Sequence, residues 1–366
     1  MSKEKTVLSP WLFLPLLILP PLSYGLLNLP FYAAQSMGAK GYLGVPVAAI
    51  MSLPGLAAIF LLARLFPGQS IIQYGQTILG PIFGRIMGLL YLGFNLVLLA
   101  VFTRDQIDMA ISYLLDRSPL SVVVLTLLLA TAYLASRGLE TIARLASFVM
   151  LPALALMAAI LATGFQNISL THVQPIAGGV FEYLQGGYSS FYIFYPAGLA
   201  AILTPFLKPL PTYPRVAGGT ILFLTLIFLL FSFGAIGVFS HEHIQRYTWP
   251  VLSFVRVIDF PYFLFDQAGL LLLIDWVALI FITTGFLQYA IALGCTGVLG
   301  VLDYKTFVWL LLPATFVLVM LPEDVTRTKM LFDVLRKIGF LFYYVYPIAL
   351  WLAAVISRRR RKTVET

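Results

Sequence analysis

Apolar runs close to twenty residues long recur along this chain from Trp11 to Ile356. A helix needs roughly 20 apolar residues to cross the hydrocarbon of a bilayer, so each run is long enough to span a membrane. Hydrophobic residues make up 60% of the chain and charged residues 10%. We therefore predict an all-α polytopic membrane protein with about ten transmembrane helices, forming one membrane domain over residues 1–366. The predicted spans are residues 11–35, 42–64, 86–115, 120–136, 142–163, 180–207, 215–240, 269–298, 304–322 and 337–357.

Helix-breaking residues interrupt the first and the sixth of these spans. The first break falls at Pro20–Gly25 and the second at Tyr195–Gly198. A broken helix survives in lipid only where protein or a water-filled cavity satisfies the freed backbone groups. Paired breaks in corresponding halves are typical of inverted repeats that bind a substrate near the midplane. Because each half has an odd number of spans, repeat one (11–163) and repeat two (180–357) insert with opposite orientation, and a basic cytoplasmic tail (358–366) follows.

The two breaks form the predicted binding site, and an amino acid is the natural ligand. Amide groups exposed around Ser23, Tyr24 and Gly25 suit a carboxylate, because the positive end of a helix dipole lies there. Carbonyl groups exposed at the second break suit an ammonium group. The candidate ligand-binding residues are Ser23, Tyr24, Gly25, Tyr192, Tyr195, Gly198, Leu199, Thr284 and Gln288. Tyrosines at membrane depth are also ordinary packing residues, and Thr284 and Gln288, which share one helix face, also suit interhelical hydrogen bonds.

Charged residues inside the membrane are costly and are therefore candidates for function. Arg104 and Asp108 are four residues apart and can pair along one helix, which favours a structural role. Arg137, Glu140 and Arg144 have the spacing of a small ion-pair cluster around a cytoplasmic turn. We predict that both groups stabilise the fold rather than bind a ligand.

Residues suited to catalysis are scarce. The chain has three histidines and one cysteine, and it lacks a phosphate-binding glycine loop. His241 and His243 flank Glu242, but without further ligands such a group binds a metal only weakly. We therefore expect no enzyme activity, no cofactor and no metal site. The net charge of +8 comes from short loops and a tail, which argues against a nucleic-acid partner.

Basic residues are biased toward one side of the predicted membrane. A cytoplasmic N-terminus satisfies the positive-inside rule, and an even number of spans then puts both termini in the cytoplasm. The connections 164–179, 241–268 and 323–336 lie outside in this topology, and the polar segment 67–85 lies along the membrane surface as a short helix. The arginine run at 358–361 either flanks the last span or binds anionic lipid headgroups.

Several short motifs resemble the spore germination permease family, the B-type subunits of germinant receptors within the amino acid-polyamine-organocation superfamily. The matching motifs, in order, are Gly25–Pro30, Leu114–Pro119, Gly138–Leu139 followed by Arg144, Trp249–Pro250 and Leu321–Asp324. The resemblance covers essentially the whole chain. It implies a LeuT-like fold of five plus five helices and a small germinant bound between helices one, three, six and eight. It also implies A-type and C-type receptor subunits as partners, in the inner membrane of the endospore.

Two functional hypotheses remain open on the sequence. The first is a germinant-receptor subunit in which ligand binding shifts a conformational equilibrium that partner subunits read. The alternative is a secondary, ion-coupled amino-acid transporter of the same fold, because fold analogy alone does not separate sensing from transport. A passive channel would require a continuous polar stripe, and the sequence has only local polar clusters.

Overall fold

The computed structural model describes residues 8–115, 117–207, 212–257, 268–301 and 303–364, and within them the protein is almost entirely helical. The N-terminal half contains α1 (Pro10–Gly25), α2 (Leu29–Met37), the 3-10 helix η1 (Gly38–Leu43), α3 (Gly44–Leu65), α4 (Ile71–Leu79), α5 (Pro81–Tyr113), α6 (Leu120–Ser136) and α7 (Leu139–Gly164). The connection predicted at 164–179 contains η2 (Phe165–Asn167) and η3 (Leu170–Val173). The elements that follow are α8 (Val180–Ser190), η4 (Phe191–Phe194), α9 (Tyr195–Gly198), α10 (Ala200–Leu203), η5 (Thr204–Phe206), α11 (Thr212–Ile244), α12 (Pro250–Arg256), α13 (Ala268–Leu299), α14 (Tyr304–Leu310), α15 (Leu312–Met320), α16 (Val325–Phe340), the π-helix η7 (Leu341–Val345) and α17 (Tyr346–Val364).

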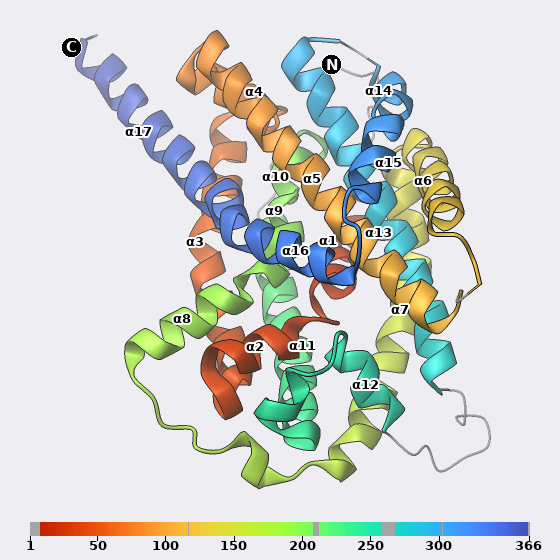
Figure 1. Cartoon of the computed structure of the whole chain (residues 1–366). Helices are drawn as coiled ribbons and strands as arrows, with labels where there is room; N and C mark the ends of the chain where they lie inside the picture. The colour runs from red at the N-terminus through yellow and green to blue at the C-terminus, as the bar shows by residue number, and fades with distance from the viewer. Residues whose placement is uncertain (1–7, 116, 208–211, 258–267, 302, 365–366) are drawn as a thin grey trace.

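Each of the ten predicted spans corresponds to helical structure in the described residues. Six helical stretches among them are long and apolar enough to cross a membrane, and three shorter helices are apolar as well. The long helices run side by side, with α4, α14 and the end of α17 at the top of the view and α2, α8 and α12 at the bottom (Figure 1). The chain is therefore a multi-pass membrane protein.

The first break lies slightly later than the sequence predicts. Pro20 and Pro21 remain inside α1, and the helix ends at Gly25. A turn over residues 26–28 follows, and α2 begins with Pro30 in its first turn, where the missing N–H of proline costs no hydrogen bond. The predicted position Pro20–Gly25 is therefore wrong by a few residues, because packed neighbouring helices tolerate proline inside a membrane helix.

The second break is spread over residues 191–206 and is not confined to the predicted Tyr195–Gly198, which form the short helix α9. Between α8 and η5 the chain passes through the short elements η4, α9 and α10, so no continuous helix spans residues 180–206. Both the first and the sixth spans are thus interrupted, which confirms this part of the predicted fold.

Two glycines with positive φ separate consecutive helices. Gly80 (φ 88°) lies between α4 and α5, and Gly138 (φ 93°) lies between α6 and α7. Glycine enters this left-handed region without steric cost, so one residue separates α4 from α5 and two, Arg137 and Gly138, separate α6 from α7. The short helix expected in 67–85 is α4, but α5 already begins at Pro81.

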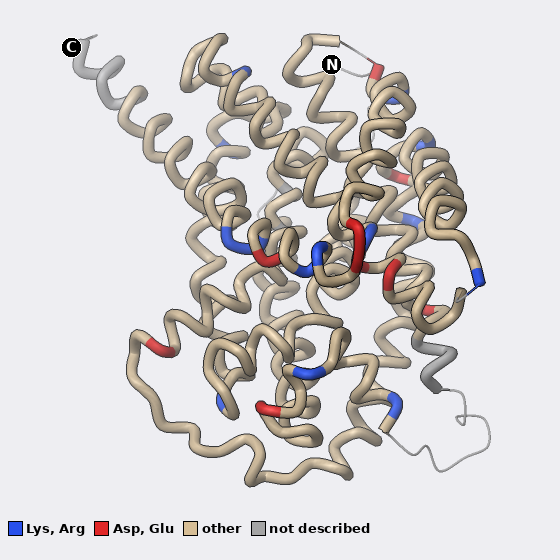
Figure 2. Tube along the Cα trace, viewed as in Figure 1, with Lys and Arg blue, Asp and Glu red and all other residues tan. Residues whose placement is uncertain are grey.

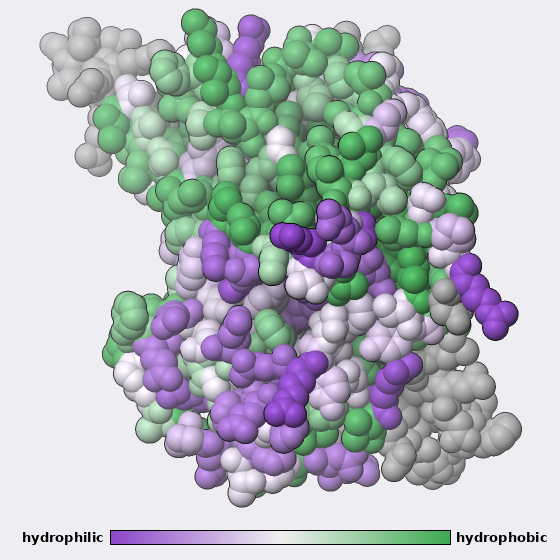
Figure 3. All heavy atoms as spheres, in the orientation of Figure 1, coloured by the Kyte–Doolittle hydropathy of each residue, from purple (hydrophilic) through white to green (hydrophobic). Residues whose placement is uncertain are grey.

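Residues 325–336 are helical, although the sequence predicts the segment 323–336 as a connection between spans. They form most of α16, which packs against α5. Figure 2 shows that Lys, Arg, Asp and Glu gather along α16 across the middle of the view, and Figure 3 shows a mainly hydrophobic surface above this band and a more hydrophilic one below it. The charges of α16 misled the prediction because the fold pairs most of them, as in the 2.8 Å ion pair of Lys329 with Asp105.

Candidate functional site

The backbones of the two breaks touch near the end of α1. The Tyr192 hydroxyl on η4 donates a 3.2 Å hydrogen bond to the carbonyl oxygen of Gly25. A Cβ atom added at Gly25 would lie 2.8 Å from Cγ2 of Ile193, closer than real Cβ contacts, so only glycine allows this approach. The fold therefore brings Ser23, Tyr24 and Gly25 together with Tyr192, as the sequence predicts for the two breaks.

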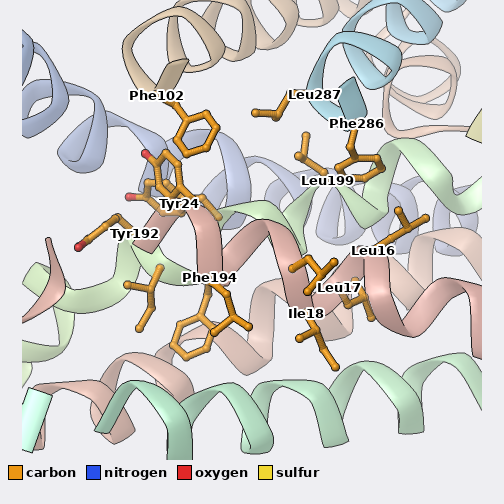
Figure 4. Close-up of a cluster of buried hydrophobic side chains, with 14 of the residues drawn as sticks. Leu16, Leu17, Ile18, Tyr24, Phe102, Tyr192, Phe194, Leu199, Phe286 and Leu287 are labelled. Carbon is orange, nitrogen blue, oxygen red and sulfur yellow. The ribbon is translucent and has the colours of Figure 1, made fainter. Parts of the chain in front are cut away.

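An aromatic cluster covers this contact. The ring centroid of Phe332, on α16, lies 5.4 Å from Tyr24, 5.9 Å from Tyr32 and 5.4 Å from Tyr192. Figure 4 shows Tyr24 beside Phe102 of α5, with Tyr192 close by and Leu199 among the neighbouring apolar side chains. Tyr24 is 2% exposed, Tyr192 0% and Phe332 1%, so the site is closed in this structure.

Three buried polar atoms at the breaks have no hydrogen-bond partner among the described residues. They are the side-chain oxygens of Ser23, Tyr24 and Ser190. A buried hydroxyl without a partner costs about 1–3 kcal/mol relative to a satisfied one. The Ser23 and Tyr24 hydroxyls lie on adjacent residues next to the contact between Gly25 and Tyr192, whereas the Ser190 hydroxyl faces Gly44 of α3, where an added Cβ atom would lie 3.2 Å from it. Buried polar groups usually have partners, so the two hydroxyls of α1 mark a place suited to a polar ligand.

Tyr195 and Gly198 support the last span rather than lining the aromatic cluster. The Tyr195 hydroxyl donates to the backbone oxygen of Arg336, and its ring stacks on Tyr343 with centroids 5.1 Å apart. A Cβ atom at Gly198 would lie 2.5 Å from a ring carbon of Tyr343. The second break thus anchors α16 and η7, and the sequence indicated neither contact.

Thr284 and Gln288 are both buried on α13. The Thr284 hydroxyl and Oε1 of Gln288 have no hydrogen-bond partner among the described residues. Gln288 lines a void of about 10 Å³ with side chains of α5, α14 and α15, including Leu96 and Thr315. The fold therefore directs Gln288 toward those helices and does not bring it to the aromatic cluster.

The predicted charge groups lie on the surface and on α5. Arg104 Nε and Asp108 Oδ1 are 2.8 Å apart and nearly buried, and Thr328 of α16 donates to the same carboxylate at 3.1 Å. Arg144 and Glu140 pair at 2.6 Å on the surface. Arg137 lies apart from that pair, because its guanidinium donates to the hydroxyl of Tyr133.

A second buried charge cluster was missed by the sequence analysis. Asp105 of α5 accepts from Asn28 Nδ2 at 2.9 Å and pairs with Lys329 Nζ at 2.8 Å. Lys329 also donates to Asn28 Oδ1 at 2.5 Å. The cluster ties the first break to α5 and α16. Asp105 itself was a signal, because a buried acid in a membrane span needs a partner, but Lys329 lay in a segment predicted as an outer connection.

No group of three or more metal-binding side chains occurs within the described part of the chain. His243, one of the flanking histidines, instead lies 3.2 Å from the hydroxyl of Ser240 through its Nδ1. The candidate site therefore lies where the two breaks meet, at the contact between Gly25 and Tyr192.

A helical membrane protein whose first and sixth spans are broken and meet near its centre has the architecture of a secondary transporter. Solved structures agree. The chain resembles a manganese transporter from Eremococcus coleocola with a TM-score of 0.62 and 12% identity, over 93% of this chain and 83% of that one. This confirms the expected LeuT-like fold and concerns the fold alone.

The family model for spore germination proteins matches residues 8–328, and the chain belongs to this family. It is 24% identical to spore germination protein YndE of Bacillus subtilis (strain 168) over 344 residues, 93% of each chain. It is 23% identical to spore germination protein A2 of the same organism over 297 residues, 81% of this chain and 80% of that one. Spore germination protein B2 is 22% identical over 352 residues, 92% of each chain.

Proposed function

We propose that this chain is the permease-like subunit of a germinant receptor. It binds a small germinant, an amino acid, where its two broken helices meet, and binding triggers spore germination. It acts in the inner membrane of the endospore with both termini in the cytoplasm, next to A-type and C-type receptor subunits. Membership of the spore germination family supports the role, and the apolar helices support a membrane location.

The observation that carries the proposal is the pair of buried hydroxyls without a described partner on Ser23 and Tyr24, beside the contact between Gly25 and Tyr192. An amino acid has both a carboxylate and an ammonium group, so it supplies acceptors and donors to these hydroxyls. The gain of these hydrogen bonds occurs only in the conformation that encloses the ligand. Binding therefore shifts the equilibrium toward that conformation, which is the requirement for a ligand-driven signal.

An ion-coupled amino-acid transporter is the second candidate. The transporter fold of the solved structure favours it, because the same broken helices serve transport in that architecture. The two functions differ in whether the ligand crosses the membrane.

Proteoliposomes of the purified full-length protein separate the two candidates. A panel of radiolabelled amino acids is tested for saturable binding and for uptake under imposed proton or sodium gradients. Saturable binding without uptake supports the receptor, and concentrative uptake supports the transporter. If no amino acid binds under either gradient, the proposed ligand class is wrong.

A pair of variants tests the position of the site. Tyr24→Ala should change which amino acids bind, because it removes an aromatic ring and a buried hydroxyl at the crossing. Tyr133→Ala is the matched control, because Tyr133 is exposed on α6. Unchanged selectivity in Tyr24→Ala, at normal protein level, would place the site elsewhere.

A further inference from the structure

A cavity of about 240 Å³ lies next to the aromatic cluster, between α2, the connection from α11 to α12 and the start of α16. Tyr32 separates the two, because its ring packs on Phe332 of the cluster and also lines the cavity. Asn28, from the first break, lines the cavity as well. The cavity therefore borders the proposed inner site, and Figure 3 shows a hydrophilic surface over this part of the molecule.

Lys329 presents an uncommitted donor to this cavity. Its Nζ is 2.8 Å from Asp105 Oδ1 and 2.5 Å from Asn28 Oδ1. The ammonium group also lies 5.4 Å from the centre of the Trp249 ring, a contact that uses no hydrogen bond. An ammonium group has three N–H donors, so one donor remains after the two contacts with oxygen atoms. The Lys329 side chain is 23% exposed and lines the cavity, so the third donor is accessible there.

Asp105 is not available to a ligand. It is 1% exposed, and it accepts from Asn28 at 2.9 Å, from the indole of Trp249 at 3.4 Å and from Lys329. Its role is to orient the ammonium group of Lys329. A ligand in the cavity thus meets the cation of the pair and not its carboxylate.

Arg246 adds a second cation to the lining. Its side chain is exposed, and no hydrogen bond or ion pair joins it to another described residue. The residues that line the cavity include these two cations and no acidic residue. Two positively charged side chains with free donors at a small cavity favour an anionic group.

We propose that this cavity is an outer binding site that receives the carboxylate group of a small molecule through Lys329 and Arg246. This inference rests on the proposed function, because the outer site would be the first contact of an amino acid on its way to the inner site. The outer site selects its ligand through the carboxylate group. The ammonium group of an amino acid then meets the other aromatic side chains that line the cavity, Phe31 and Tyr247.

Propionate and its neutral analogue propionamide are the probes, because they differ in charge and hardly in size. Saturation-transfer NMR on the full-length protein in nanodiscs measures the affinity for each, with empty nanodiscs as the blank. We expect propionate to bind more tightly than propionamide. We expect the difference to shrink at high salt, because partly exposed cations are screened.

Arg246→Gln and Arg327→Gln form a matched pair. Both arginines are exposed and neither side chain has a described partner, but only Arg246 lines the cavity. Arg246→Gln should weaken propionate binding about two- to fivefold, the range of an exposed ion pair. Arg327→Gln should leave it unchanged.

The double variant Lys329→Gln with Asp105→Asn tests the buried pair without leaving one charge alone. It should weaken propionate binding by at least about tenfold, because it removes a partly buried charged donor. Arg246→Gln remains a valid test if this double variant fails to fold. Equal binding of propionate and propionamide, or equal effects of Arg246→Gln and Arg327→Gln, would refute the outer carboxylate site.

The experiments distinguish a failure of the outer site from a failure of the proposed inner site. If amino-acid selectivity depends on Tyr24 but the protein binds propionate and propionamide with equal affinity, only the outer site is refuted. If Arg246→Gln weakens propionate binding but Tyr24→Ala leaves the amino-acid selectivity unchanged, only the proposed inner site is refuted.

Discussion

Removing one hydroxyl from each of two neighbouring tyrosines should have opposite effects on stability. The rings of Tyr24 and Tyr192 lie 5.9 Å apart, and both side chains are buried. The Tyr192 hydroxyl donates to the carbonyl oxygen of Gly25, whereas the Tyr24 hydroxyl has no hydrogen-bond partner among the described residues. The same substitution, Tyr→Phe, therefore removes a satisfied group at one position and an unsatisfied group at the other.

The expected magnitudes follow from this difference. Tyr24→Phe should raise the free energy of unfolding by about 1–3 kcal/mol, because it removes the cost of a buried hydroxyl without a partner. Tyr192→Phe should lower it by about 0.6 kcal/mol, and at most about 1.7 kcal/mol, which is the measured scale of hydrogen bonds inside membranes. Each variant keeps its ring, so packing against Phe332 is preserved in both.

Unfolding in detergent, followed by heat or denaturant without added ligand, measures both variants against the unmodified protein. The same unfolding experiment with a saturating amino acid measures how much stability ligand binding adds to each variant. Tyr24→Phe should gain less stability from the ligand than the unmodified protein does, because it has lost one ligand contact. A destabilised Tyr24→Phe without ligand would show that its hydroxyl is satisfied, and the argument for the inner site would lose its main observation.

Two further predictions concern the frame around the site. Asp108→Asn should destabilise the protein by about 3–5 kcal/mol and lower its level in membranes, because Arg104 is left as an unpaired buried charge. Glu140→Gln, which breaks an exposed pair, should cost about 0–1 kcal/mol, and comparable losses in the two variants would contradict the assignment. Gly198→Ala should cost about 1–3 kcal/mol in an unfolding assay, because its Cβ would lie 2.5 Å from a tyrosine ring carbon of η7. Gly219→Ala places its Cβ in open space, so it should be neutral or slightly stabilising, and a loss there equal to that of Gly198→Ala would refute the steric explanation.

The sequence by itself determined the class of protein and the outline of its fold. Apolar runs of spanning length specify helices, because lipid offers no partner to an unpaired backbone group. Proline and glycine marked the first and sixth spans as interrupted, and the structure has both interruptions. Spacing along a single helix also indicated local pairs, such as Arg104 with Asp108. All of these features depend on residues close together in the chain.

Only the tertiary structure decided which side chains meet across helices. It directs Gln288 toward α5, α14 and α15, and it joins Tyr195 to the backbone of α16. It also pairs Asp105 with Lys329, from a segment whose charges resembled those of an outer connection. Periodicity shows which residues share a helix face, but the neighbour of that face depends on how distant helices pack. A charged residue is stable inside a membrane protein only when such a neighbour neutralises it, and for that reason the second charge cluster was visible only in the folded chain.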